Sequence, residues 1–191
     1  MCQNGRGRCG NPDGKLCCQL ERECCAVACQ DSFTPAENPG TRPWPERRLA
    51  RPGDLAALVA LDRICFGRRA WPARAWREAV TGPEWTTVVV ERGGAIAAAS
   101  VLLLARPRAS LASLAVAPLW RRQGLGRALL RDAVARARAA SFRWLSLEVD
   151  RANRGAAALY RREGFAPLRR FREDGCWRQE MIRRLGGARG V

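Results

Sequence analysis

The stretch LAVAPLWRRQGLGRALLRDAV, residues 114–134, runs from an apolar strand pattern through a glycine turn into a helix pattern. Pro118 interrupts the apolar run, and Gly124 and Gly126 precede an arginine-rich amphipathic segment. The first turn of a helix leaves four backbone N–H groups without internal partners, and the helix dipole adds about half a positive charge there. Because glycine lacks a Cβ, another molecule can approach this turn closely, so the stretch predicts a seat for phosphate groups.

Three arginines flank this turn and would add positive charge beside a pyrophosphate: Arg121, Arg122 and Arg127. The spacing matches neither the GxxxxGK(S/T) loop nor the dinucleotide pattern GxGxxG, because the residue three after Gly126 is Leu129. Two glycines one residue apart also occur as a simple turn device. The motif alone therefore leaves a purely structural role open.

Outward from this stretch, residues 46–186 alternate between strand and helix patterns. We expect strands over 46–50, 84–92, 95–105, 109–116, 142–149, 165–170 and 177–184, and helices after Asp54 and over 72–80, 124–140 and 153–163. The strand at 95–105 is apolar on both alternating faces, so helices should cover both sides of the sheet. This order predicts an α/β domain with a central mixed sheet.

Capping residues and apolar faces mark the expected helices. Asp54 is predicted to cap the first helix, whose apolar stripe comprises Leu55, Leu58, Val59 and Leu61. The helix over 124–140 carries one apolar face of Leu125, Leu129, Ala133 and Ala137. Asn153 is predicted to cap the last helix and Gly164 to end it.

The formal net charge of +16 would ordinarily favour nucleic acid as a partner. Lys15 is the single lysine, however, and abundant arginine, alanine and glycine are typical of GC-rich codon usage. The arginines are spread over expected helices and loops without the aromatic interleaving of a single-strand binding surface. We expect most of them to lie on solvated faces and no direct nucleic-acid partner to be required.

The chain contains no apolar run of membrane-spanning length and no pattern of a secretory signal peptide, so we expect a cytoplasmic protein without a membrane partner. Seven of the nine cysteines lie before residue 30, in a segment without helix or strand periodicity. That segment has no CxxC pair and the chain has no histidine, so zinc is poorly supported and we expect no metal. We expect residues 1–45 to be a disordered leader or an over-extended translation start, 46–186 the domain, and 187–191 a tail.

Two blocks of the sequence resemble one enzyme family. Arg121, Gly124 and Gly126 form RxxGxG after an apolar strand, which resembles the pyrophosphate loop of the GNAT superfamily of acetyl-CoA-dependent N-acetyltransferases. LEVDRANRGAAALYRREGF, residues 147–165, is similar to LEVRxSNxxAxxLYxxxGF of RimI-like members, which acetylate the N-terminal alanine of a small-subunit ribosomal protein. The segment CFGRRAWPARAW at 65–76 also resembles their first helices, and the resemblance extends over 47–185.

Two departures stand beside the expected peptide site and leave the exact acceptor open. Asp150 occupies a position where the RimI-like pattern has arginine, and Ala152 one where it has serine.

The resemblance implies the GNAT fold, in which splayed central strands, here at 114–116 and 147–149, bind acetyl-CoA as cosubstrate without a metal. It implies that the backbone N–H of Val116 polarises the thioester carbonyl. The residues expected to contact the cofactor are Leu114, Ala115, Val116, Arg121, Arg122, Gln123, Gly124, Leu125, Gly126, Arg127 and Asn153.

Two side chains have the chemistry that acetyl transfer requires. In the RimI-like pattern Glu148 is the general base that takes a proton from the amine, although a structural salt bridge with one of many arginines would also explain it. Tyr160, the only tyrosine, is by resemblance the general acid that protonates the departing thiolate, although its ring could simply pack in the core.

A covalent acyl-enzyme would need an activated cysteine, but the chain has no histidine that could act as a base for Cys65 or Cys176. We therefore expect direct transfer in a ternary complex from acetyl-CoA to a protein N-terminal amine, an alanine of a ribosomal protein, by a monomer or weak dimer. Two alternatives are a GNAT enzyme acting on a small amine, such as a polyamine or aminoglycoside, and a non-catalytic coenzyme A-binding or RNA-associated module.

Overall fold

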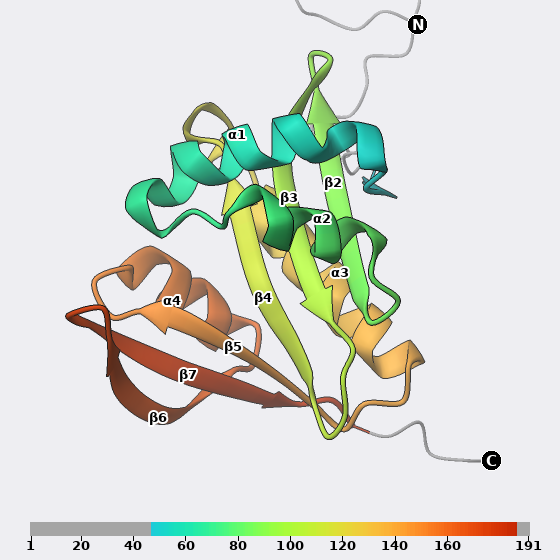
Figure 1. Ribbon diagram of the computed structural model, residues 1–191. Helices are drawn as coiled ribbons and strands as arrows, with labels where there is room; N and C mark the ends of the chain where they lie inside the picture. The colour runs from blue at the N-terminus through green and yellow to red at the C-terminus, as the bar shows by residue number, and fades with distance from the viewer. Residues whose placement is uncertain (1–46, 187–191) are drawn as a thin grey trace, which may run out of the picture. The chain divides into compact units, whose positions relative to one another are not determined.

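A seven-stranded mixed sheet runs through residues 47–186, the part of the chain that this computed structural model describes (Figure 1). The predicted leader, 1–45, and tail, 187–191, lie outside the described residues. The strand order is β1-β2-β3-β4-β5-β7-β6. The strands are β1 (Arg47–Leu49), β2 (Trp85–Arg92), β3 (Ala95–Leu103), β4 (Ala109–Val116), β5 (Trp144–Asp150), β6 (Ala166–Glu173) and β7 (Cys176–Arg184).

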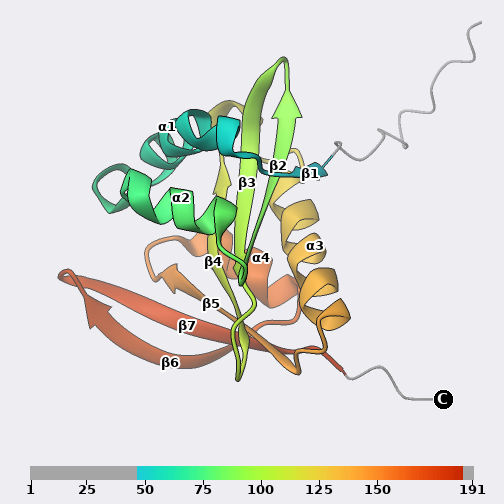
Figure 2. The same cartoon turned by 45° about the vertical axis from the view of Figure 1, so that its right-hand side comes forward.

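Helices cover both faces of the sheet (Figure 2). α1 (Leu55–Phe66) and α2 (Ala73–Thr81) lie on one face, while α3 (Leu125–Ala139) and α4 (Arg154–Arg162) lie on the other. Short 3-10 turns, η1 (Pro52–Asp54), η2 (Gly67–Arg69) and η3 (Pro118–Trp120), join some of these elements. Within the described residues no helix combines the length and the apolar character that crossing a membrane would take. The α/β architecture and the order of elements predicted from the sequence are confirmed.

β3 is the most deeply buried strand, as its two apolar faces predicted. Residues 97–102 are all buried. On one face, Ala99 and Val101 belong to a cluster with Leu58 of α1 and Trp76 of α2. On the other, Ala98 belongs to a cluster with α3. Burial on both sides fixes the position of β3, and with it that of its neighbour β4.

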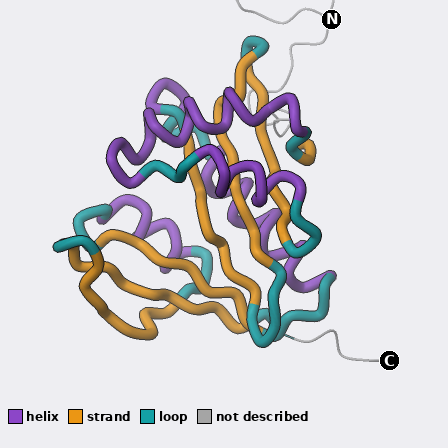
Figure 3. Tube along the Cα trace, viewed as in Figure 1, coloured by secondary structure: helices purple, strands orange, loops and turns teal. Residues whose placement is uncertain are grey.

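β4 and β5 separate along their length (Figure 3). Their parallel pairing covers three residue pairs, from Ala109↔Leu145 to Leu111↔Leu147. β4 nevertheless continues to Val116 and β5 to Asp150. The splay implied by the family resemblance is therefore present, and it opens the sheet beyond Leu111 and Leu147.

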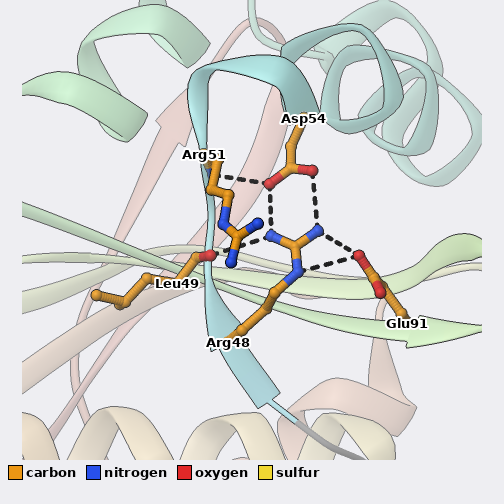
Figure 4. Close-up of polar contacts among 5 residues, drawn as sticks. All are labelled: Arg48, Leu49, Arg51, Asp54 and Glu91. Atoms are coloured by element: carbon orange, nitrogen blue, oxygen red, sulfur yellow. Dashed lines mark hydrogen bonds and ion pairs between the residues drawn. The ribbon is translucent and has the colours of Figure 1, made fainter.

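The start of α1 differs from the prediction (Figure 4). Asp54 directly precedes α1, but its side chain caps no N–H group of that helix. Its Oδ2 instead accepts the Arg51 N–H at 2.7 Å, and the Arg48 guanidinium donates to both carboxylate oxygens and also pairs with Glu91. The Arg48 hydrogen bonds lower the pKa of Asp54. The predicted cap is wrong because both oxygens of this carboxylate already accept hydrogen bonds from Arg48 of β1, and one of them also accepts the Arg51 N–H.

The ends of α4 follow the prediction. Asn153 Oδ1 accepts the Ala156 N–H at 3.1 Å, which caps the helix. Gly164 follows the helix with φ +84°, a left-handed conformation that favours glycine. The apolar face predicted for α3, Leu125, Leu129, Ala133 and Ala137, is buried.

Candidate active site

A cavity of about 980 Å³ fills the gap where β4 and β5 separate. The ends of these strands, the turn before α3, and α4 all contribute to its wall. Of the predicted site residues the cavity brings together Leu114, Ala115, Val116, Arg121, Arg122, Gly124, Leu125, Gly126, Arg127, Glu148, Asn153 and Tyr160. Gln123 is the exception: it is not part of the wall, and its side-chain amide donates to the Leu119 carbonyl at 3.4 Å. The turn thus directs the Gln123 side chain back to η3, and its contact with the cofactor stays a prediction.

The turn before α3 has the backbone form that the glycines predicted. Gly124 has φ +86°, and it directly precedes α3. Gly126 lies inside the first turn of α3, where an added Cβ would approach Val116 Cγ2 to 3.6 Å and Leu159 Cδ2 to 3.7 Å. These are ordinary contact distances, so packing within the protein does not itself require glycine at 126. The absent side chain leaves space on the cavity side of the turn.

The arginines of this turn have different partners. Arg121 Nε donates to the Val116 carbonyl at 3.0 Å, and its side chain is exposed. Arg127 Nε lies 2.8 Å from a carboxylate oxygen of Glu163, which directly follows α4. Arg127 therefore lines the cavity as predicted, and its guanidinium pairs with a carboxylate that it shares with Arg131.

Glu163 joins the first two turns of α3 to the end of α4. Its side chain is buried and also accepts bonds from Arg131 at 2.9 and 3.1 Å. The Arg131 hydrogen bond, the charge of Arg131 and the Arg127 guanidinium lower the pKa of Glu163. The two helices that bear the glycine turn and Tyr160 are thus tied together by one ionised carboxylate.

Glu163→Gln should lower the melting temperature at pH 7 by roughly 3–8 °C, because two guanidinium groups lose their counter-charge while the side-chain shape is kept. A carboxylate with a lowered pKa in the folded state stabilises that state above the unfolded pKa of about 4.3. This stabilisation disappears as the pH falls through the folded pKa. Thermal melts at pH 7 and at about pH 3 should therefore show the difference from wild type shrinking in acid; an equal difference at both pH values would contradict this role.

The N–H group of Val116 faces the gap between the strands. The Ala117 N–H donates to the Ala97 carbonyl at 2.9 Å, toward β3. Neighbouring residues of a strand direct their N–H groups to opposite edges, so that of Val116 points toward β5. Because β5 no longer pairs with β4 at this level, the group remains available to a ligand.

Glu148 belongs to β5 and reaches the cavity from the face opposite Leu147 and Val149. Its side chain is 42% exposed, and its Oε2 lies 3.2 Å from Arg178 Nη2 on β7. The same arginine approaches Glu173 more closely, at 2.6 Å. The salt bridge considered from the sequence is thus present. Arg178 lies farther from Glu148 than from Glu173, and the Glu148 side chain stays accessible.

Tyr160 belongs both to the core and to the cavity wall. It is 7% exposed, and its ring centroid lies 6.1 Å from that of Phe165. Burial raises the pKa of Tyr160 to about 12. The phenol therefore keeps its proton throughout the neutral range, while its position on the wall keeps it near any group bound in the gap.

Cys65, at the end of α1, also lines the cavity. Its Sγ donates to the Val116 carbonyl at 3.4 Å. Burial raises the pKa of the Cys65 thiol, in spite of the nearby Arg121 guanidinium. A protonated thiol is a poor nucleophile, so this environment favours direct transfer over an acyl-cysteine.

The wall also contains residues that the sequence analysis did not assign to the site, among them Asp62, Arg69 and Arg178. The buried Asp62 accepts the Trp71 N–H at 2.5 Å, and burial raises its pKa. Arg178 stands opposite Asp150 in the pairing of β5 with β7. One signal in the sequence was Asp150, which departs from the RimI-like pattern; in the structure it pairs with Arg69 at 2.6 Å.

Known proteins share this architecture. The sequence model of the acetyltransferase (GNAT) family matches residues 55–165. A candidate ribosomal protein bS18-alanine N-acetyltransferase of Bacillus subtilis (strain 168) is 32% identical over 92 residues, which cover 48% of this chain and 61% of that relative. The chain thus matches less than two thirds of that relative's length.

Solved structures agree. The ribosomal-protein-S18-alanine N-acetyltransferase from Escherichia coli superposes with a TM-score of 0.68 at 26% identity, over 75% of this chain and 95% of that one. The yncA protein from Salmonella typhimurium, solved with its cofactor acetyl-CoA, has a TM-score of 0.63 at 19% identity, over 77% and 97% of the two chains, and supports the fold alone. Since the family match covers more than half of the sequence and includes both the glycine turn and the strand bearing Glu148, the chain belongs to the acetyltransferase (GNAT) family.

Proposed function

We propose that this protein transfers the acetyl group of acetyl-CoA directly to the N-terminal amine of another protein. One observation carries the proposal: a single cavity collects the glycine turn before α3, the free edge of β4, Glu148 and Tyr160. These groups match the demands of the reaction, which are a seat for the pyrophosphate, a donor for the carbonyl, a base for the amine and an acid for the thiolate.

The cofactor binds along the gap in this proposal. The first turn of α3 offers unpaired N–H groups to the pyrophosphate, with Arg121 and Arg122 beside it. The N–H of Val116, which points into the gap, donates to the thioester carbonyl oxygen. Negative charge develops on this oxygen when the amine attacks, so the hydrogen bond strengthens in the transition state.

The amine approaches from the side of Glu148. An N-terminal α-amine has a pKa of about 7.7–8.0, so an appreciable fraction is already neutral near pH 7. Glu148 takes a proton from the fraction of the amine that is still protonated, directly or through water. Its accessible carboxylate supports that role. Tyr160 donates its proton to the thiolate when the carbon–sulfur bond breaks, and Cys65 forms no covalent intermediate.

The acceptor is, in this proposal, an N-terminal alanine of a ribosomal protein. The names of the Bacillus subtilis and Escherichia coli relatives support this choice. The segment that resembles the RimI-like pattern also contains both Glu148 and Tyr160. Asp150 and Ala152, which depart from that pattern, bear on the identity of the acceptor more than on the chemistry.

Coenzyme A release by the full chain, with acetyl-CoA and either an Ala-initiated peptide or a polyamine, tests this proposal. We expect turnover on the peptide at least about tenfold faster than on the polyamine, and mass spectrometry should locate the acetyl group on the peptide's α-amine. Turnover on the polyamine alone would move the protein to the small-amine class. Binding of acetyl-CoA without turnover on either acceptor would instead indicate a coenzyme A-binding module.

A further inference from the structure

An ion pair joins the α1–α2 connection to the end of β5. Arg69 Nη1 of η2 donates to Asp150 Oδ2 at 2.6 Å, across 81 positions of sequence. Both residues line the cavity. Figures 1 and 2 both show the α1–α2 connection directly above the end of β5. The ion pair thus links two walls of the same cavity.

Asp150 is well suited to hold this link. Its Oδ1 accepts the Ala152 N–H at 2.8 Å, which orients the carboxylate and leaves Oδ2 to Arg69. The Ala152 N–H and the Arg69 guanidinium lower the pKa of Asp150, so it is ionised at neutral pH. On the other wall, Asp62 holds the Trp71 N–H, which anchors the connection just after Arg69.

The link stands at a short distance from Glu148. Glu148 and Asp150 are two residues apart on β5, so their side chains lie on the same face of the strand. Two residues of a strand span about 7 Å. An amine that reaches Glu148 from the Asp150 end of β5 has its neighbouring carbon, and the group on that carbon, next to the Arg69–Asp150 pair.

We infer that Arg69 and Asp150 determine acceptor specificity by limiting the size of the group on the carbon that bears the amine. This inference rests on the proposed function. The pair admits acceptors whose first residue carries a hydrogen or a methyl group, as in glycine or alanine. A branched side chain such as that of leucine would have to displace Arg69 from Asp150 before its amine could reach Glu148.

Two substitutions break this contact by different routes. Arg69→Ala removes the guanidinium and leaves the bond between Asp150 and the Ala152 N–H in place. Asp150→Asn keeps an oxygen for that N–H and removes the charge that holds Arg69. Arg68→Ala is the matched control, because it removes an exposed arginine from the same turn. A surface ion pair contributes little to stability, so all three variants should fold.

The measurement is kcat/KM for two peptides that differ only in their first residue, alanine or leucine. We expect wild type to prefer the alanine peptide by about 50-fold or more, in keeping with the discrimination that a few methylene groups allow. Arg69→Ala and Asp150→Asn should each reduce this preference at least about fivefold by raising turnover of the leucine peptide, and Arg68→Ala should leave it within about twofold. General loosening of the fold would lower both rates and would not shift the ratio.

An unchanged ratio in both variants, with the alanine peptide still acetylated, would overturn the inference and leave the proposed function intact. Wild-type protein that acetylates neither peptide would overturn the proposed function, and the inference with it. The two failures are distinguished by the wild-type rate on the alanine peptide.

Discussion

Tyr160→Phe should lower kcat for acetyl transfer about 100-fold and leave the KM for acetyl-CoA within about threefold, because the substitution removes only the proton donor. The ring is buried and packs near Phe165, so phenylalanine fills the same space. Since burial raises the pKa of Tyr160 to about 12, the wild-type phenol is protonated at every pH used in an ordinary assay. Steady-state kinetics at pH 7.5 provides the measurement.

Phe165→Leu is the control for this substitution. It disturbs the same part of the core and leaves the Tyr160 hydroxyl in place. We expect it to lower the melting temperature and to keep kcat within about threefold of wild type. If Tyr160→Phe also kept kcat within that range, the hydroxyl would not be the acid, and the tyrosine would be a core residue only.

Glu148→Gln should lower kcat/KM for an N-terminal amine about 100-fold at pH 7, because an amide cannot accept the proton of the amine. The amide has nearly the same shape and its oxygen can still contact Arg178, so we expect the local structure to be kept. The defect should shrink as the pH rises above about 8, where the α-amine is already neutral without help. A pH series from 6.5 to about 9.5 measures both effects.

Glu173→Gln is the matched control for Glu148→Gln. Glu173 pairs with the same arginine, at 2.6 Å, and its side chain is 48% exposed, close to the 42% of Glu148. We expect this control to retain kcat/KM within about threefold. Equal losses in the two variants would show that disturbance of Arg178, rather than loss of a base, accounts for the effect.

The sequence predicted the elements of the fold because each has a local signature. The two-sided apolar pattern of β3 predicted a strand between helical layers, and the turn around Gly124 predicted a ligand seat. Pairing order has no such signature. β7 inserts between β5 and β6, and this places Arg178 beside Glu148, a contact that depends on a register across separate strands.

The partners in the ion pairs of the site could not be predicted from the sequence either. The chain has 34 lysine and arginine residues for 18 acidic ones, so no carboxylate identifies its own partner. Glu163 pairs with Arg127, and Asp150 with Arg69, only because helices and strands distant in the chain meet in space. At Asp54 the partners are instead close in the chain: Arg48, six residues before it, and the Arg51 N–H, three residues before it, bind the carboxylate that was predicted to cap α1.

The central claim is direct transfer of acetyl between two molecules bound in the same cavity. The most direct measurement is a rapid-quench single turnover of the full chain with radiolabelled acetyl-CoA and an Ala-initiated peptide, with the label located by mass spectrometry and counting. We predict that label passes from coenzyme A to the peptide's α-amine and never accumulates on the tryptic fragment 64–68, which contains Cys65. Label that appears on this fragment and leaves it as fast as acetyl-peptide forms would contradict direct transfer and establish an acyl-enzyme.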